Sequence, residues 1–177
     1  PGHHFERTYP RSVDVPDAAR SFGIGAYGEG WGMYAEELAA RESGVLDDDL
    51  SRVGFLMHAL DAWNGLELDI RMHLQGWTRE QVIARTMEVT GKSRSVAEVY
   101  ADRHAAAPGQ LASYMLGYHA IRTMRDDAAR ALGTRFDVRD FHQRVLEAGP
   151  LPLPVVQDRV RAWVRAWVRA WVHEAQR

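Results

Sequence analysis

The stretch DDLSRVGFLMHALDAWNGLELDIRMHLQ, residues 48–75, decides the fold together with Gly76 and the TREQ motif at residues 78–81. Aspartates crowd the start of the long segment, where the positive end of a helix dipole favours acidic side chains. Gly76 is a typical helix stop. The TREQ motif has the spacing of a capping box at the start of another helix. We therefore predict two consecutive helices, over residues 48–75 and 78–89.

Glycine and proline divide the rest of the chain in the same way, and apolar side chains recur at helical spacing between them. The glycine- and proline-containing tract of residues 1–28 is predicted to form loops or short turns. Further helices are predicted over residues 29–43, 95–103, 110–132, 137–149 and 155–176. No stretch has a strand pattern, so the predicted fold class is all-α. A length of 177 residues fits one domain or a large piece of one.

The composition narrows the possible chemistry. The formal charge is −2, which gives no general electrostatic reason to bind nucleic acid. No apolar run is long enough to cross a bilayer, so no transmembrane segment is predicted. The chain has no cysteine, which excludes disulfides, thiolate metal ligands and a cysteine nucleophile. Any metal must therefore be held by histidine, aspartate or glutamate.

The first candidate site combines His3 and His4 with Glu29, which opens a predicted helix. Two histidines and a glutamate are a workable zinc ligand set, and a catalytic zinc needs three protein ligands and one open position. Glu36 lies two turns after Glu29 on the same face and is a candidate for orienting a ligand, whereas Glu37 is expected to be solvated. A histidine pair near a chain end is more often simply solvated, and this alternative stays open.

The second candidate site lies in two later helices. Asp69 and His73 are four residues apart, so a carboxylate can fix the histidine tautomer there. Gln110 and Tyr114 flank a predicted helix start, where amide and hydroxyl groups can stabilise an oxyanion. Ser113 lacks a nucleophile-elbow motif and is rejected as a nucleophile. A surface pair and an ordinary helix turn are the structural alternatives. The remaining histidines are expected to be structural or solvated: His58, His104, His119, His142 and His173.

The tail contains the sequence Val-Arg-Ala-Trp three times in a row, between Val160 and Trp171. A period of four on an α-helix drifts by about 40° per repeat, so Trp163, Trp167 and Trp171 form a slanted stripe. This stripe either packs on the domain or offers an apolar face for self-association. We favour a short duplication that extends a surface helix.

Five segments, in order, resemble one bacterial family, domain of unknown function 885 (DUF885), whose members look like zinc metallopeptidases of the gluzincin type. PGHH, residues 1–4, resembles the second half of the family's His-Glu-x-x-Pro-Gly-His-His motif, and EGWGMYAEELA, residues 29–39, its Glu-Gly-Trp-Ala-x-Tyr-Ala-Glu segment. DIRMHLQGWTREQ (69–81), PGQLASYMLG (108–117) and FDVRDFHQRVLEAGPLPLPVV (136–156) resemble its later blocks.

This resemblance implies that the chain is the C-terminal part of a single helical domain that hydrolyses a peptide or another amide substrate with zinc. His3 takes the place of the motif's second metal-binding histidine, with His4 as the less favoured choice, and Glu29 that of the downstream glutamate ligand. The first half of the motif would supply another histidine ligand and the general-base glutamate. We therefore expect this chain to be inactive alone, and a non-catalytic helical binding or scaffold module is the alternative.

The resemblance also assigns roles around the metal. Tyr114 and His73 become candidates for stabilising the tetrahedral oxyanion, Asp69 would orient His73, and Gln110 would line the cleft. Arg71 stands where many members of the family have glycine, and this departure is expected to alter the wall of the cleft.

Overall fold

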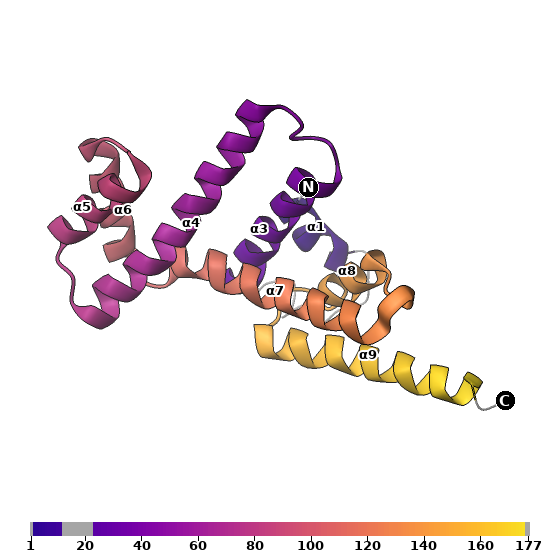
Figure 1. The fold of residues 1–177 in the computed structure, drawn as a ribbon. Coiled ribbons are helices and arrows are strands. Elements are labelled where there is room, and N and C mark those ends of the chain that lie inside the picture. The colour runs from indigo at the N-terminus through magenta and orange to yellow at the C-terminus, as the bar shows by residue number, and fades with distance from the viewer. Residues whose placement is uncertain (1, 12–22, 176–177) are drawn as a thin grey trace. The chain divides into compact units, whose positions relative to one another are not determined.

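The computed structural model describes residues 2–11 and 23–175, and all regular elements in these two ranges are helical (Figure 1). The prediction of an all-α fold is thus confirmed. In chain order the elements are α1 (Gly2–Thr8), η1 (Tyr9–Arg11), α3 (Gly25–Glu42), α4 (Asp49–Gln75), α5 (Arg79–Thr90), α6 (Arg94–Ala106), α7 (Gln110–Leu132), η2 (Gly133–Arg135), α8 (Val138–Leu146) and α9 (Leu153–Ala175).

The predicted boundaries of α4 and α5 follow the local capping chemistry, whereas α6 extends past its predicted end to Ala106 and α8 ends at Leu146, before its predicted stop at Gly149. The Asp48 carboxylate accepts a hydrogen bond from the Ser51 N–H at 2.9 Å and so caps α4. Thr78 and Gln81 form the predicted capping box, with the Thr78 N–H donating to Gln81 Oε1 at 2.8 Å. Gly76 ends α4 with a φ of 72°, a left-handed conformation that glycine adopts without strain.

The prediction for the N-terminal tract is wrong where the structure describes it. Residues 2–11 form α1 and η1 rather than loops, and α3 begins at Gly25, before the predicted start at Glu29. Residues 12–22 of that tract lie outside the described residues. A helix as short as α1 is not stable alone, so contacts with other elements must hold it.

The chain divides into two compact units, which are described separately below. The first comprises Pro1–Tyr34 and Gly117–Arg177, and the second Ala35–Leu116. None of the helices in the described ranges has both the length and the apolar character needed to cross a bilayer. Whether the two units together form the single predicted domain is not decided by this division, so the single domain stays a prediction.

In the first unit α3 and α7 touch backbone to backbone. A β-carbon on Gly30 would lie 2.3 Å from the carbonyl carbon of Gly117, and one on Gly117 would lie 1.8 Å from the Ala26 oxygen. Only glycine fits at this crossing. Around it lies an apolar core that includes the fully buried side chains of Tyr27 and Phe141.

The second unit is built on α4, α5 and α6, whose buried side chains form one cluster: Leu68, Val82, Ile83, Ala97 and Ala101. Trp77 packs against this cluster, and the Arg71 guanidinium lies 4.4 Å from the centre of its indole ring. The Nε of Arg71 also donates to Glu67 Oε1 at 2.7 Å. Arg71, the departure from the family pattern, therefore has structural partners within its own unit.

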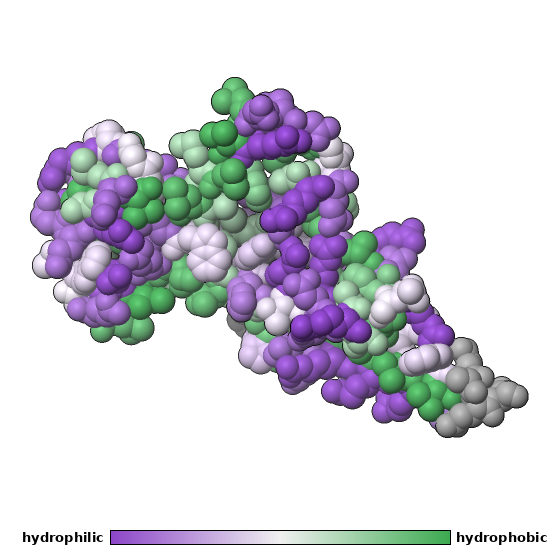
Figure 2. Space-filling model, in the orientation of Figure 1, coloured by the Kyte–Doolittle hydropathy of each residue, from purple (hydrophilic) through white to green (hydrophobic). Residues whose placement is uncertain are grey.

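The surface of α4 carries an apolar stripe on the side that its own unit does not cover (Figure 2). Its members follow helical spacing, and each is at least two-fifths exposed: Val53, Leu56, Met57, Leu60 and Trp63. Single exposed apolar side chains are normal, but a stripe at helical spacing is an unpartnered helix face.

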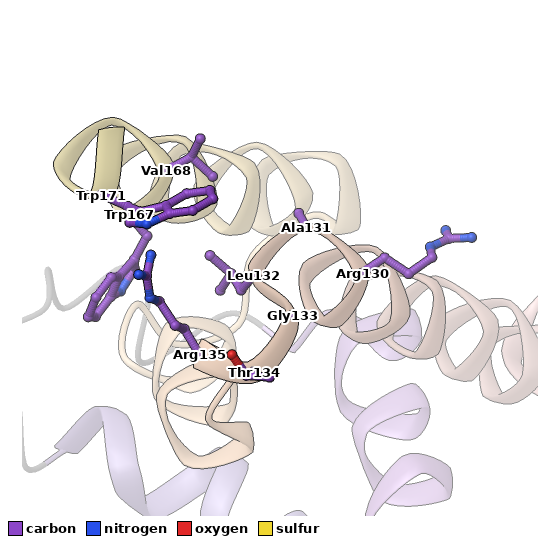
Figure 3. Close-up of a pocket in the computed structure, with 9 residues that line it drawn as sticks. All are labelled: Arg130, Ala131, Leu132, Gly133, Thr134, Arg135, Trp167, Val168 and Trp171. Carbon is purple, nitrogen blue, oxygen red and sulfur yellow. The ribbon is translucent and has the colours of Figure 1, made fainter. Parts of the chain in front are cut away.

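The α9 helix is buried only at its start. Val156 and Val160 belong to the core of the first unit, whereas Trp167 and Trp171 are 44% and 48% exposed. The guanidinium of Arg135 lies 4.6 Å from the centre of the Trp171 ring. These two tryptophans border a cavity of about 320 Å³ between α9 and the turn that follows α7 (Figure 3).

Candidate metal centre

The candidate metal ligands lie where α1 rests directly on the backbone of α3. Gly28 and Gly32 are one turn apart on α3. A β-carbon on Gly28 would lie 3.5 Å from Glu6 Oε1, and one on Gly32 would lie 3.1 Å from the His3 ring. Gly32 therefore lets the His3 ring approach the helix that carries Glu29, whereas the 3.5 Å at Gly28 is an ordinary van der Waals contact.

His3 lies between two carboxylates. Its Nε2 is 3.4 Å from Glu29 Oε2, and its Nδ1 is 3.6 Å from Glu6 Oε1. The His3 side chain is 46% exposed, whereas the Glu29 and Glu6 side chains are 20% and 6% exposed. His4 is exposed, and its ring contacts Phe5 edge-on. Of the two neighbouring histidines, His3 is therefore the one that faces Glu29.

The spacing of His3 and Glu29 fits zinc. Zinc–nitrogen and zinc–oxygen bonds of about 2.0–2.2 Å at a tetrahedral angle place two ligand atoms ~3.4 Å apart. The observed 3.4 Å between Nε2 and Oε2 matches this separation. Within residues 2–11 and 23–175 no group of three or more His, Cys, Asp or Glu residues could hold a metal. The two residues thus fit as part of a ligand set, and zinc binding stays a prediction.

An aromatic cluster holds the start of α1 against α3. The Trp31 indole N–H donates to the Gly2 carbonyl oxygen at 2.9 Å. The Trp31 ring meets the His142 ring edge-on, with centroids 5.5 Å apart, and His142 Nε2 lies 2.8 Å from the hydroxyl oxygen of the buried Tyr34. His142 is thus a structural histidine, and α8 supports the residue next to His3.

Glu6 lies deeper than its position on a short helix suggests. It is 5% exposed, and Arg7 Nε donates to its Oε1 at 3.2 Å. Burial, with a further contribution from the nearby Glu6 charge, raises the pKa of Tyr27 far above its usual range. The Tyr27 hydroxyl therefore stays protonated and donates to the Val145 carbonyl at 3.1 Å.

In the second unit Asp69 joins three helices. One carboxylate oxygen accepts from the Ala112 N–H at 2.7 Å, in the first turn of α7, and the other accepts from His104 Nδ1 at 3.1 Å. Asp69 is 4% exposed and His104 is fully buried. The expected contact with His73 is present at 3.6 Å from Nε2 to Oδ1, but His104 is the closer histidine.

The protonation pattern of this cluster follows from its partners. His73 Nε2 lies 3.0 Å from the His104 carbonyl oxygen, which only accepts, so Nε2 carries the proton. Burial, the largest cause, lowers the pKa of His104, while the Asp69 carboxylate opposes this effect. His104 Nε2 is buried without a hydrogen-bond partner, which suits a neutral ring with its proton on Nδ1.

The start of α7 carries the other predicted cleft residues. Gln110 and Tyr114 are both partly buried. Ser113 Oγ donates to the Gln110 carbonyl oxygen at 2.7 Å. Asp69, His73, Gln110 and Tyr114 belong to the second unit, and His3 and Glu29 to the first. That the two sets share one cleft stays a prediction.

The acidic residues that follow Glu29 have other partners. Glu36 Oε2 lies 2.7 Å from His58 Nδ1 within the second unit. The expectation that Glu37 is solvated is wrong, since it is 4% exposed and its Oε1 lies 2.9 Å from Arg41 Nε. Helical spacing alone therefore did not predict the partners of Glu36 and Glu37.

Two residues were missed as site candidates because their signal is not local. Glu6 stands three residues after His3, a spacing that becomes informative only once residues 2–8 are known to be helical. His104 is 35 positions from Asp69, and only the packing of α6 against α4 brings them together.

Comparisons with known proteins identify the family of this chain. The model of the family described as "Bacterial protein of unknown function (DUF885)" matches residues 1–160. Among curated proteins no match was found. One similar crystal structure is "the putative lipoprotein from Colwellia psychrerythraea", with 34% identity and a TM-score of 0.81, covering 85% of this chain and 26% of that one.

A second similar structure is described as "a putative lipoprotein of unknown function from Shewanella oneidensis", with 28% identity and a TM-score of 0.81. The similarity covers 89% of this chain and 29% of that one, so this chain spans less than a third of either solved protein. Because the family model matches nearly the whole sequence, the chain belongs to the bacterial DUF885 family.

Proposed function

We propose that this chain forms the C-terminal part of a zinc-dependent peptidase or other amide hydrolase and contributes His3 and Glu29 to the metal site. The observation that carries the proposal is the 3.4 Å separation of His3 Nε2 and Glu29 Oε2. When bound, zinc would supply a water whose pKa is lowered to about 7 and which is therefore nucleophilic at neutral pH. His3 and Glu29 would hold the ion, and the Trp31–Gly2 hydrogen bond would steady the segment that carries His3.

The residues of the second unit would act on the substrate. Tyr114 would donate its hydroxyl proton in a hydrogen bond to the developing oxyanion. His73 uses its Nε2 proton on the His104 carbonyl, so a neutral ring offers substrate only the Nδ1 lone pair, and Nδ1 must carry a proton as well to stabilise an oxyanion. Asp69 would position His73 from 3.6 Å, and Gln110 would line the cleft.

This proposal assigns a general base to none of the described residues, because His3 and Glu29 are both assigned to the metal. Zinc with two protein ligands binds less tightly than zinc with three. We therefore propose that the chain alone does not hydrolyse amides and that longer family members add the histidine and glutamate of the His-Glu-x-x-Pro-Gly-His-His motif. Zinc-dependent amide hydrolysis by the 177-residue chain alone would contradict this.

Metal titration tests the ligand assignment. The chain is titrated calorimetrically with Zn²⁺ beside its His3→Ala and Glu29→Gln variants, with His4→Ala as the matched control. We expect the first two changes to weaken binding by roughly tenfold or more, since each removes a zinc ligand, and the His4 change to have little effect. Equal losses for all three, or none for Glu29→Gln, would refute the assignment.

A non-catalytic helical module is the second candidate, and one observation favours it. Asp69, the residue proposed to position His73, uses both carboxylate oxygens to hold α6 and α7 to α4. Such a cluster has a complete structural role without any chemistry. Retention of a bound partner by a variant that lacks both His3 and Glu29 would support the module over the enzyme.

Self-association through the tryptophan stripe is a separate proposal about partners. Trp167 and Trp171 are exposed, whereas Trp163 is partly buried, so only two of the three can meet another chain fully. The family match ends at residue 160, where the tryptophan repeat begins. Changing Trp167 and Trp171 to glutamine should lower the mass measured by light scattering, and an unchanged mass would remove this proposal.

A further inference from the structure

Glu6 is a buried carboxylate on a short helix whose other charged and aromatic side chains are exposed. His3, His4, Phe5 and Arg7 are all exposed, yet Glu6 is 5% exposed. Burying a carboxylate is costly unless it is paired or hydrogen-bonded. Arg7, whose Nε donates to Glu6 Oε1, is one partner that offsets this cost.

The partners of Glu6 Oε1 lie on two sides. Arg7 Nε donates to it at 3.2 Å, and His3 Nδ1 lies 3.6 Å from it. On the α3 side, a β-carbon on Gly28 would lie in ordinary van der Waals contact with the same oxygen, at 3.5 Å. The Glu6 carboxylate thus lies beside Nδ1 of the His3 ring.

The two nitrogens of His3 face different carboxylates, Nδ1 towards Glu6 and Nε2 towards Glu29. In a neutral imidazole one nitrogen carries the proton and the other keeps a lone pair, and neighbouring groups decide which. The distances of 3.6 and 3.4 Å are similar, but the Glu6 side chain is 6% exposed and the Glu29 side chain 20%. Water screens the charge of the less hydrated Glu6 carboxylate less, while Arg7, 3.2 Å from the same Glu6 oxygen, offsets part of that charge.

We infer that Glu6 is a positioning residue that holds His3 as the Nδ1–H tautomer and so directs the Nε2 lone pair towards Glu29. A carboxylate behind a histidine fixes its tautomer and ring orientation and raises its basicity as a ligand. What the lone pair binds rests on the proposed function, which makes it zinc. The tautomer itself does not depend on that function.

Imidazole nitrogen resonances test the inference directly. The full chain, labelled with ¹⁵N and kept free of metal, is measured at about pH 8.5, well above the ordinary histidine pKa. His3 is assigned by the loss of its signals in His3→Ala. We expect the Nδ1–H pattern in the parent chain, mostly Nε2–H in Glu6→Ala, and an intermediate pattern in Glu6→Gln, which keeps an acceptor oxygen.

Glu29→Gln is the matched control, because it alters the carboxylate on the other side of the same ring and should leave the Nδ1–H pattern in place. An Nε2–H or doubly protonated ring in the parent chain, or a pattern that both Glu6 variants leave unchanged, would overturn the inference. If Glu6→Ala does not fold, as judged by circular dichroism, the isosteric Glu6→Gln decides the question.

Zinc titration of the same variants separates this inference from the proposed function. Glu6→Gln should weaken Zn²⁺ binding by roughly 10- to 100-fold, the usual cost of losing a residue that orients a ligand. A tautomer that depends on Glu6 in a chain that binds no zinc would uphold the positioning role and refute the metal site. If zinc binding needs His3 and Glu29 but the His3 tautomer does not change in the Glu6 variants, the metal site is upheld and the positioning role of Glu6 is refuted.

Discussion

The chain has two clusters of histidine and carboxylate side chains, one around Asp69 and one around His3, and they differ in how tightly they are hydrogen-bonded and how far they are buried. Around Asp69 the bonds are 2.7 and 3.1 Å long and the carboxylate and His104 are both buried. Around His3 the nearest carboxylate atoms lie 3.4 and 3.6 Å away, and nearly half of the histidine side chain is exposed. The Asp69 cluster is closed and its bonds are used within the fold. The His3 cluster is open, and the 3.4 Å between His3 Nε2 and Glu29 Oε2 equals the separation expected of two zinc ligands.

Removing one carboxylate from each cluster should give the largest difference between them, measured as the loss in the free energy of unfolding. Asp69→Ala leaves the Ala112 N–H and His104 Nδ1 without their acceptor. Leaving a buried donor unsatisfied costs about 1–3 kcal/mol of the free energy of unfolding for each donor. Glu29→Ala should cost less than about 1 kcal/mol, as expected for a partly exposed pair. Urea unfolding followed by circular dichroism measures both.

The matched variant Asp69→Asn keeps the size and one acceptor oxygen, so it should recover part of the loss. If Asp69→Ala and Glu29→Ala destabilise the chain equally, the distinction between a closed and an open cluster fails.

The pH dependence of stability should come in part from the closed cluster. Burial lowers the pKa of His104 below its value in the unfolded chain. The unfolded state therefore binds more protons between the two pKa values, and the free energy of unfolding falls as pH drops below about 6.5. Above that pH the contribution is fully present, and below the folded-state pKa no more is lost.

Urea unfolding of the parent chain and of His104→Asn between pH 5 and 8 tests this sign. Asparagine has no titrating ring but can still donate a hydrogen bond to Asp69. We expect the variant to be less stable at pH 8 and to have a shallower slope between pH 7 and pH 5. An equal slope in the two proteins would show that His104 is not the source.

Features set by neighbouring residues could be predicted from the sequence, whereas features set by packing between distant segments could not. The capping box of Thr78 and the stop at Gly76 are local, so they set the bounds of α4 and α5 correctly. The helix α1 was missed because a seven-residue helix has no stability of its own and depends on contacts such as the Trp31–Gly2 bond. The pairing of Asp69 with His104 has no local signal at all.

The last prediction tests how tightly the open cluster is built. Gly32→Ala places a β-carbon 3.1 Å from the His3 ring, so the ring must move by a few tenths of an ångström. Gly54→Ala on α4 is the matched control, since nothing lies within 4 Å of a β-carbon there. Alanine in a helix interior is favoured over glycine by about 0.5–1 kcal/mol.

Gly54→Ala should therefore stabilise the chain by about 0.5–1 kcal/mol in urea unfolding. Gly32→Ala should gain less, because the displaced His3 ring offsets part of the helix propensity. It should also weaken Zn²⁺ binding severalfold while Gly54→Ala leaves it unchanged. If both alanines stabilise equally and neither alters binding, the His3 ring adjusts freely, and the 3.4 Å spacing to Glu29 is not enforced by the α3 backbone.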